Sequence, residues 1–481
     1  MATVPRPGTD HREGNGLIMN LKDHRGLRTA MLCLLYFAQG FPWGFVIYAL
    51  IAVFIEGGFT RVETVLISSV AILPWSFKFL WAPLIDSIRW PALGLRRPWI
   101  AIAQLGMAVT LLATDQIGEI GPLTTEATVE VSPWLSRFFS WIPDSEVVVG
   151  ATSVSAIVFV SGVFFLHNCF ASLQDVATDA LAVDILEEEE RGRVNGFMWA
   201  SKLFGTAVGT YGGAVMIENY GMNATIQVQA AMVLVILAAV LMVTERPGEK
   251  RFPWSRGKTV SRQTAALRSP IIVMQELFRA LTLWTTAIGV LVAMLYSVCQ
   301  GVFINLAADT FVKVFDWSAI EYAKAQGSYG VCGEVIGAIA GGFFCDRFGR
   351  RKMAFIGGLI ASGSLIVFGL LHPYWLSDSF SPLWIIPLFK GATAFQTVAL
   401  FSLFMKISWT TAAATQFTLY MSVSNFGMLL GTQLNKLEWQ QWQLFVLGGT
   451  SALIPIVLLL LMKPDFVVKK RLADEKSGEP I

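Results

Sequence analysis

Charged side chains occur inside apolar stretches of this 481-residue chain, where burial makes them costly. Lys78 lies in such a stretch, FKFLWAPLID (77–86), which ends at Asp86. Asp175 and Asp179 are four residues apart, so they share one face of a helix. A charge at membrane depth needs water, an opposite charge or a change of protonation. We therefore expect Lys78 to be the counter-charge of these aspartates, one of which takes up and releases a proton; a fixed ion pair that joins helices is the alternative.

Other polar side chains extend this set. Lys202 could join Lys78 and the aspartates at one level, whereas Asp184, about half a turn away from Asp175, is expected at the membrane face. Glu334 lies among small residues that favour close helix packing. Lys390 is the cation that we expect to meet an anionic substrate group, with extension to the outer surface as the alternative. The candidates for substrate or proton binding are Lys78, Gln174, Asp175, Asp179, Lys202, Gln300, Glu334, Lys390 and Gln396.

The elements that must position these residues are membrane-spanning helices. The chain is 54% hydrophobic and 15% charged, against roughly 25% charged residues in soluble domains. A span needs about 20 mostly apolar residues. Twelve stretches qualify, at 29–52, 64–85, 98–115, 150–173, 195–216, 225–243, 281–305, 325–345, 353–371, 383–406, 412–433 and 442–462. We expect a tail (1–28), a six-helix half (29–243), a linker (244–280), a second half (281–462) and a tail (463–481).

Charge outside the spans predicts the orientation. Basic residues gather in both tails, in the linker and in the turns after the second and eighth spans, whereas the loop between the third and fourth spans is acidic. Cytosolic loops carry the excess of Lys and Arg, so both termini and the linker are expected in the cytosol. The aromatic segment 132–144 is expected to form an interfacial helix, or else a lid over the outer mouth.

The turns after the eighth and second spans and the loop after the fourth span carry charged motifs that are expected to act together. GGFFCDRFGRRK (341–352) resembles the signature of the major facilitator superfamily, and a degenerate copy follows the second span. We expect the cations of the signature to pair with its acid. The loop DILEEEERGRVNG (184–196) resembles the corresponding facilitator loop, and four of its residues are expected to pair with the turn after the second span, with a solvated run of charges as the alternative: Glu189, Glu190, Arg191 and Arg193. The expected gating residues are Asp86, Arg96, Arg97, Asp184, Glu190, Arg191, Arg193, Gly342, Asp346, Arg347, Gly349, Arg350 and Arg351.

A finer resemblance lies in FAQGFPWG (37–44), KFLWAPLID (78–86) and QDVATDALAVDIL (174–186). These stretches look like the branch of AmpG-type muropeptide permeases and acetyl-coenzyme A transporters. Some members carry two extra helices, for which the linker here has no room.

The resemblance implies an all-α facilitator fold with two pseudo-symmetric halves, and a monomeric transporter in a bacterial inner membrane. Its partners would be protons, the bilayer and a bulky polar or anionic solute, muropeptide-like, imported by alternating access. The alternatives are a siderophore, an acyl-coenzyme A-type metabolite, or a non-transporting protein that binds lipid or pigment.

Other functions are disfavoured by the sequence. The four histidines are scattered, the five cysteines form no CxxC pair, and no Walker A sequence occurs. We therefore expect no enzyme, metal, cofactor or nucleic-acid partner.

Overall fold

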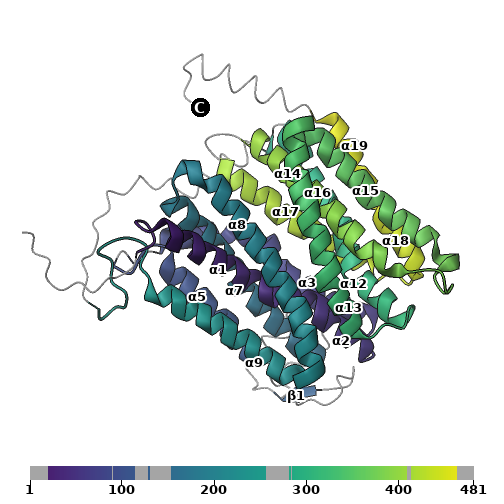
Figure 1. Ribbon diagram of the computed structural model, residues 1–481, viewed down its shortest axis with the longest axis horizontal. Helices are drawn as coiled ribbons and strands as arrows, with labels where there is room; N and C mark the ends of the chain where they lie inside the picture. The colour runs from purple at the N-terminus through teal and green to yellow at the C-terminus, as the bar shows by residue number, and fades with distance from the viewer. Residues whose placement is uncertain are drawn as a thin grey trace, which may run out of the picture.

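The computed structural model describes residues 20–88, 90, 92–113, 128–130, 153–255, 281–282, 284–408 and 413–462. This part is almost entirely helical (Figure 1), with one short antiparallel pair of strands, β1 (Thr128–Glu130) and β2 (Ser153–Ser155). The expected interfacial segment 132–144, residues 1–19 of the first tail, the whole second tail and most of the linker lie outside the described residues, whereas residues 25–28 of the expected first tail belong to the first helix.

Six rods form the first half, coloured purple to teal in Figure 1. Several rods combine helical segments, and the last two are divided at Gly221, whose φ of 81° and ψ of 175° are not helical. The segments are α1 (Arg25–Gly44), η1 (Phe45–Leu50), α2 (Ile51–Glu56), α3 (Arg61–Ser76), η2 (Lys78–Leu80), α4 (Trp81–Ser87), α5 (Arg97–Ala113), α7 (Ala156–Ile185), α8 (Glu188–Ala207), η4 (Val208–Gly212) and α9 (Gly213–Met242).

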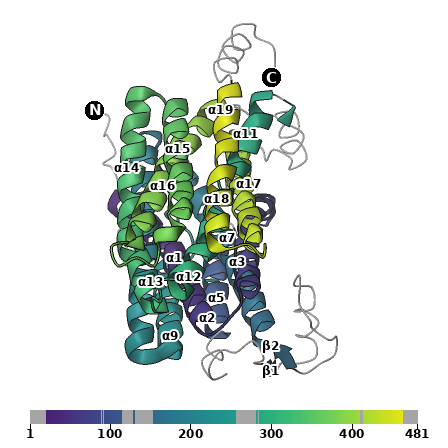
Figure 2. The same cartoon turned by 90° about the vertical axis from the view of Figure 1, so that its right-hand side faces the viewer.

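Six more rods form the second half, which faces the viewer in Figure 2. Their segments are α11 (Trp284–Leu295), α12 (Val298–Lys313), α13 (Ala319–Ala325), η5 (Gln326–Gly330), α14 (Val331–Phe348), α15 (Arg350–Leu370), α16 (Ile385–Ile407), α17 (Ala413–Leu434), α18 (Gln441–Ser451) and α19 (Leu453–Leu461), with η6 (His372–Tyr374) and η7 (Pro382–Trp384) between α15 and α16. In the described residues, nine helical stretches are long and apolar enough to cross a membrane. The predicted all-α membrane fold with two six-helix halves is confirmed.

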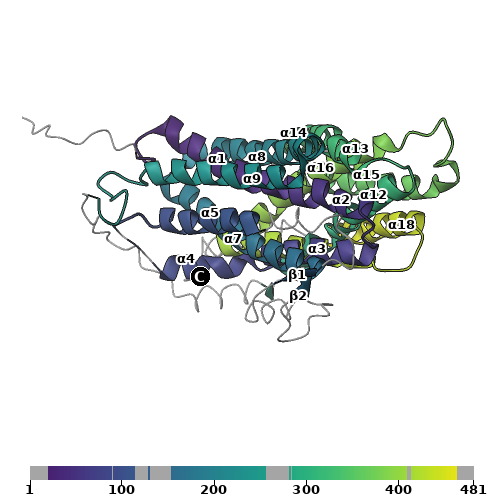
Figure 3. The same cartoon turned by 90° about the horizontal axis from the view of Figure 1, so that it is seen from below.

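Buried apolar residues connect the halves mainly at one end of the bundle. The largest buried cluster combines Phe54 and Phe59 of the first half with Phe311 and Tyr322 of the second. Two further clusters lie each within a single half. We call the end near this mixed cluster the Arg61 end and the opposite one the Arg97 end; α1 and α8 run side by side between them (Figure 3).

Three expected spans differ from the structure, because the fourth and seventh end later than expected and the second is not one straight helix. The fourth span continues to Ile185 rather than ending at 173, so Asp175 and Asp179 lie inside the helix. Its length is possible because both carboxylates find buried partners, described below. The second span is not one straight helix, because α3 ends at Ser76 and Phe77, with φ −112° and ψ 12°, leaves the helical region before the 3-10 turn at Lys78.

Candidate functional site

A buried ion pair lies in the first half. Lys78 Nζ donates to Asp175 Oδ2 at 2.8 Å, and both residues are 3% exposed. The helix break before Lys78 places the lysine in η2, beside α7, which carries Asp175. The pairing that the sequence left open between the two aspartates is therefore with Asp175 in this structure.

Asp179, one turn further along α7, has a different partner. It accepts a hydrogen bond of 2.5 Å from the Tyr36 hydroxyl of α1. Within the described part of the chain, no cation lies at salt-bridge distance from Asp179. The neighbouring Gln174 donates its Nε2 to the Leu35 carbonyl of α1 at 3.0 Å. The two carboxylates thus lie close together, but only Asp175 has a paired positive charge.

Lys202 of α8 completes the group. Its Nζ lies 4.9 Å from the ring centre of Trp75, 5.4 Å from that of Trp199 and 6.0 Å from that of Tyr36, all within cation–π range. Close packing of α8 on α1 makes this possible, because Gly40 has no Cβ, and a Cβ there would lie 2.0 Å from the Lys202 carbonyl oxygen. The predicted convergence of Lys78, Lys202 and the aspartates agrees with this geometry.

The second half holds another buried pair. Lys390 Nζ of α16 lies 3.1 Å from Glu334 Oε1 of α14 and 4.2 Å from the ring centre of Tyr48 in the first half. Lys390 is 4% exposed, so it does not extend to a surface. Its charge is already met by Glu334, which weakens its expected role as the free cation for a substrate.

The two glutamine candidates of the second half are not part of these groups. Gln396 packs against α15, since a Cβ at Gly358 would lie 2.6 Å from its Nε2. Gln300 is half-buried on α12, and its Nε2 has no hydrogen-bond partner among the described residues.

A polar network at the Arg61 end was missed by the sequence analysis. Arg61, the first residue of α3, lies 3.0 Å (Nη2) from Asp309 Oδ2 on α12 of the other half. Asp309 also pairs with Lys313 at 3.0 Å and accepts from Gln441 at 3.3 Å. The apolar stretch was predicted to end at 305, so Asp309 was left outside it; the i, i+4 spacing of Asp309 and Lys313 was the available signal.

Further contacts between the halves lie on the same side of the bundle. Ser68 of α3 donates to Asn305 of α12 at 2.7 Å. Gln433 of α17 donates to Ser69 at 2.5 Å, and Lys324 of α13 bonds Glu218 of α9 at 2.6 Å. The halves are therefore joined by buried apolar packing and by polar bonds at the Arg61 end.

At the Arg97 end, one expected gating contact forms and another does not. Arg96 Nε bonds Asp184 Oδ2 at 3.1 Å, as expected for a latch between the turn and the end of α7. Glu190 pairs instead with Arg28 at the start of α1, so its expected pairing with the turn is wrong. Arg191 bonds the Val183 carbonyl at 3.2 Å.

The start of the linker folds onto the same turn. Glu245 accepts bonds of 2.6 Å from the backbone N–H groups of both Arg96 and Arg97, at the beginning of α5. Glu249 accepts from the backbone N–H groups of Glu245 and Arg246 at 3.0 and 3.1 Å. Burial, together with the nearby Glu245 charge, raises the pKa of Glu249 to about 7.

The signature turn of the second half joins α14 to α15. Gly349 has a φ of 92°, a conformation that other residues rarely adopt. Arg351 Nη2 bonds the Leu460 carbonyl at 2.5 Å. Asp346 and Arg347 are exposed, and within the described residues no ion pair of Asp346 is found, so the expected pairing of the acid with its cations is not observed.

The remaining gating candidates lie in the same two regions. Asp86 is in α4, Arg193 is exposed on α8, Gly342 is in α14 and Arg350 begins α15.

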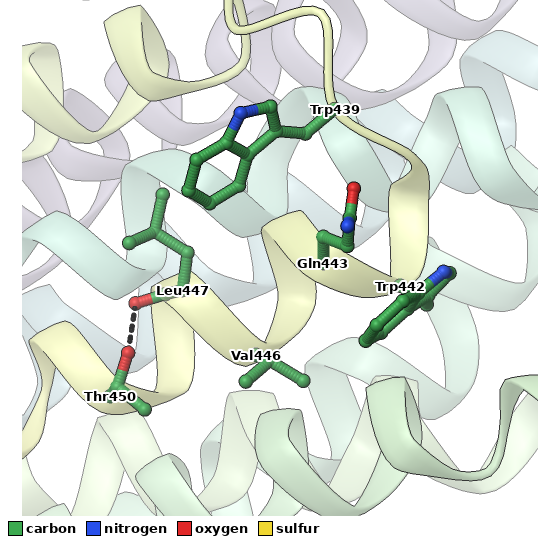
Figure 4. Close-up of a pocket in the computed structure, with 6 residues that line it drawn as sticks. All are labelled: Trp439, Trp442, Gln443, Val446, Leu447 and Thr450. Atoms are coloured by element: carbon green, nitrogen blue, oxygen red, sulfur yellow. Dashed lines mark hydrogen bonds between the residues drawn. The ribbon is translucent and has the colours of Figure 1, made fainter.

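An open depression of about 290 Å³ lies on α18 and the residues just before it (Figure 4). Trp439, Trp442 and Leu447 are among its lining residues. Tryptophans at the end of a span are typical of the bilayer interface. No group of three or more His, Cys, Asp or Glu side chains suited to a metal occurs among the described residues.

Comparison with known proteins gives a consistent result. A family model described as Major Facilitator Superfamily matches residues 32–432. The chain is 23% identical over 457 residues to the anhydromuropeptide permease of Escherichia coli K12, covering 90% of this chain and 79% of the permease. It is also 23% identical over 418 residues to a transporter of Rickettsia conorii designated AmpG 4, covering 84% of this chain and 89% of that one.

Solved structures resemble the fold at low sequence identity. The inward-open xylose transporter XylE of E. coli superposes with a TM-score of 0.61 at 12% identity, over 90% of this chain and 95% of the transporter. The nucleoside transporter NupG superposes with a TM-score of 0.61 at 14% identity, over 92% and 99% of the two chains.

Proposed function

The chain belongs to the major facilitator superfamily, whose members are transporters rather than enzymes, and we propose that it is a proton-coupled secondary transporter. Its solute is a bulky polar or anionic compound of the muropeptide type, imported by alternating access. The similarity to an anhydromuropeptide permease over most of both chains supports this substrate class. We place it in a bacterial inner membrane with both termini and the linker in the cytosol, so that the Arg61 end faces outward.

One observation in the first half supports the proposed proton coupling. Asp175 is buried and Asp179 is half-buried on one face of α7, and within the described residues only Asp175 has a cation at salt-bridge distance. A carboxylate that is partly removed from water and has no paired cation is costly in its charged form. Among the described residues, the Tyr36 hydroxyl is the donor that bonds Asp179, and Asp179 is therefore our candidate for the group that takes up the proton.

Alternating access needs one end to open while the other closes. The bonds of Arg61 with Asp309 and of Ser68 with Asn305 hold the halves together at the Arg61 end. With the orientation proposed above, this conformation is closed to the outside. The proton and the solute would then be released toward the cytosol from the region of Asp179.

Uptake into proteoliposomes under an inward proton gradient tests the function. The panel holds anhydromuropeptide, a ferric siderophore and acetyl-coenzyme A. We expect gradient-driven uptake of anhydromuropeptide by the wild type and its loss in Asp179→Asn. The matched control is Asp378→Asn, which removes an exposed carboxylate in the loop after α15 and should leave uptake unchanged.

The other outcomes separate the parts of the proposal. Uptake of only the siderophore or only acetyl-coenzyme A would show that the proposed substrate is wrong and that the protein is nevertheless a transporter. Unchanged gradient-driven uptake in Asp179→Asn would move the proton site elsewhere, with Glu334 as the next carboxylate to test. No uptake of any compound by folded protein would contradict the transport function itself.

A further inference from the structure

Three buried or half-buried lysines lie at the level of the charge clusters, and one of them differs from the others. Lys78 bonds Asp175 at 2.8 Å and Lys390 lies 3.1 Å from Glu334. For Lys202, no carboxylate oxygen within the described part of the chain lies at salt-bridge distance. Its neighbours are the aromatic rings of Tyr36, Trp75 and Trp199, which we call the aromatic box.

The aromatic box is held in place by hydrogen bonds on its far side. Trp75 Nε1 donates to Asn168 Oδ1 of α7 at 2.8 Å, a bond between two buried side chains. The Tyr36 hydroxyl donates to Asp179. Two of the three rings therefore have fixed orientations without Lys202, and rigid walls of this kind lower the ordering cost of binding.

The ammonium group of Lys202 has unused hydrogen-bonding capacity. An ammonium carries three donors and no acceptor. Aromatic faces attract its charge but offer no strong acceptor for these donors. Lys202 is half-buried and Trp199 is 43% exposed, whereas Lys78 and Lys390 are 3% and 4% exposed. Lys202 is therefore the accessible cation of the three, and an oxyanion is the group that would complement it.

The charges around Lys202 link an anion to a proton. The charged groups that act on Lys202 are Lys78 of η2 and Asp175 and Asp179 of α7, and the Tyr36 ring of α1 lies 6.0 Å from its Nζ. With both lysines and both aspartates ionised, their charges cancel. A proton on Asp179 leaves one net positive charge, which a carboxylate or phosphate at Lys202 would neutralise. Binding of the proton and of the anion would thus favour each other.

We propose that Lys202 binds an oxyanion of the transported solute, with the ring of the solute next to that oxyanion packed on the aromatic box. This rests on the proposed function and narrows the solute to an organic anion whose carboxylate or phosphate lies beside a flat or sugar ring. Lys202 of α8 then takes the role that sequence analysis gave to Lys390, whose charge is already paired with Glu334.

Equilibrium binding to the purified protein, followed by tryptophan fluorescence, tests this assignment apart from transport. The probes are anhydromuropeptide with free carboxylates, the same compound with its carboxylates amidated, and acetyl-coenzyme A as the phosphate-bearing arm. We expect the wild type to bind the free carboxylate form at least about ten-fold more tightly than the amidated form, equivalent to about 1.4 kcal/mol. If the wild type binds acetyl-coenzyme A tightly but not the free carboxylate form of anhydromuropeptide, phosphate is the recognised group.

Four variants give the comparison. Lys202→Met should reduce the ratio between the charged and amidated probes to about one while still binding the amidated probe, which shows that the protein is folded. Lys202→Arg should keep most of the ratio. Asp179→Asn should bind the anion with little dependence on pH, whereas the wild type should bind it more tightly as the pH falls. Lys406→Met, at an exposed position of α16, is the control and should behave as the wild type.

Two results would overturn the assignment. One is a Lys202→Met protein that keeps the full ratio, and the other is a wild type that distinguishes neither anionic probe from the amidated one. Gradient-driven uptake is measured on the same preparations, so that a failure of the Lys202 assignment can be told apart from a failure of the proposed transport function. If the wild type shows uptake and Lys202→Met keeps the wild-type ratio of affinities for the charged and amidated probes, the protein is a transporter but Lys202 does not bind the anion.

Discussion

Arg61 and Asp309 connect the two halves of the molecule across 248 positions of the sequence, with Arg61 Nε and Nη2 donating to Asp309 Oδ2 at 3.2 and 3.0 Å. Asp309 is 2% exposed and Arg61 also bonds the Trp439 carbonyl at 3.1 Å. The Arg61 side chain is 19% exposed, so we expect breaking this pair to cost less than the about 3–5 kcal/mol of a fully buried pair. This bond is therefore well placed to hold the Arg61 end shut.

Removing that charge should open the Arg61 end. In Asp309→Asn we expect a cysteine introduced at Ser69, in a background without native cysteines, to be alkylated several-fold faster than in the parent. Ser69 is buried beneath the network, where Gln433 bonds it, so its reactivity reports opening. Asp378→Asn should leave the alkylation rate unchanged. Equal rates in Asp309→Asn and the parent would show that other contacts keep this end closed.

The Lys78–Asp175 pair should be worth more to stability than an exposed ion pair. Lys78→Met leaves Asp175 buried without its cation, so we expect the free energy of unfolding to fall by about 3–5 kcal/mol. Lys78→Met combined with Asp175→Asn removes both charges and should recover most of this loss, measured by thermal unfolding in detergent.

Transport by the same double variant separates the two roles of the pair. If the pair only joins helices, the stable double variant should retain gradient-driven uptake. If the pair balances the charge of the coupling site, uptake should stay low although stability returns. If the loss of stability in the double variant equals the sum of the losses in Lys78→Met alone and Asp175→Asn alone, Lys78 and Asp175 do not interact directly.

Apolar length and charge type predicted much of the architecture from the sequence alone. The number of spans, the two halves and the approach of Lys78 to the Asp175 face follow from helix periodicity and the cost of buried charge. The choice between Asp175 and Asp179 did not follow, because it depends on the helix break at Phe77 and on the Tyr36 hydroxyl of another helix.

The contacts that sequence analysis missed also depend on the packing of different helices against each other. Asp309 and Arg61 read as charges at the ends of separate spans, and only the packing of the halves brings them together. Glu190 was assigned to the nearest basic turn, yet Arg28 of α1 lies closer in space. Lys390 was expected to meet an anionic group of the substrate, and its contact with Glu334 did not follow from the sequence because the two residues lie on different helices.

The turn between α14 and α15 should depend on the backbone freedom of Gly349. Its φ of 92° is costly for residues with a Cβ, so Gly349→Ala should lower stability by about 1–2 kcal/mol. Gly342→Ala is the matched control, since a Cβ there meets nothing within 4 Å and alanine favours the helix. We expect thermal unfolding at a lower temperature for the first variant only. Equal unfolding temperatures in the two variants would show that the turn relaxes without cost.

Glu249 should make the stability of the Arg97 end depend on pH. Its folded pKa of about 7 is above the ordinary value of 4.5, so the folded state holds the proton more tightly than the unfolded state. This contribution to stability is complete below about pH 4.5 and is lost as the pH rises through 7. Glu249→Gln keeps an oxygen that can accept from the backbone N–H groups of Glu245 and Arg246 but cannot ionise. We therefore expect the wild type to lose thermal stability relative to Glu249→Gln between pH 5 and pH 8, with Asp378→Asn following the wild type. Parallel curves for wild type and Glu249→Gln would mean that Glu249 does not change its protonation between the folded and unfolded states in this range.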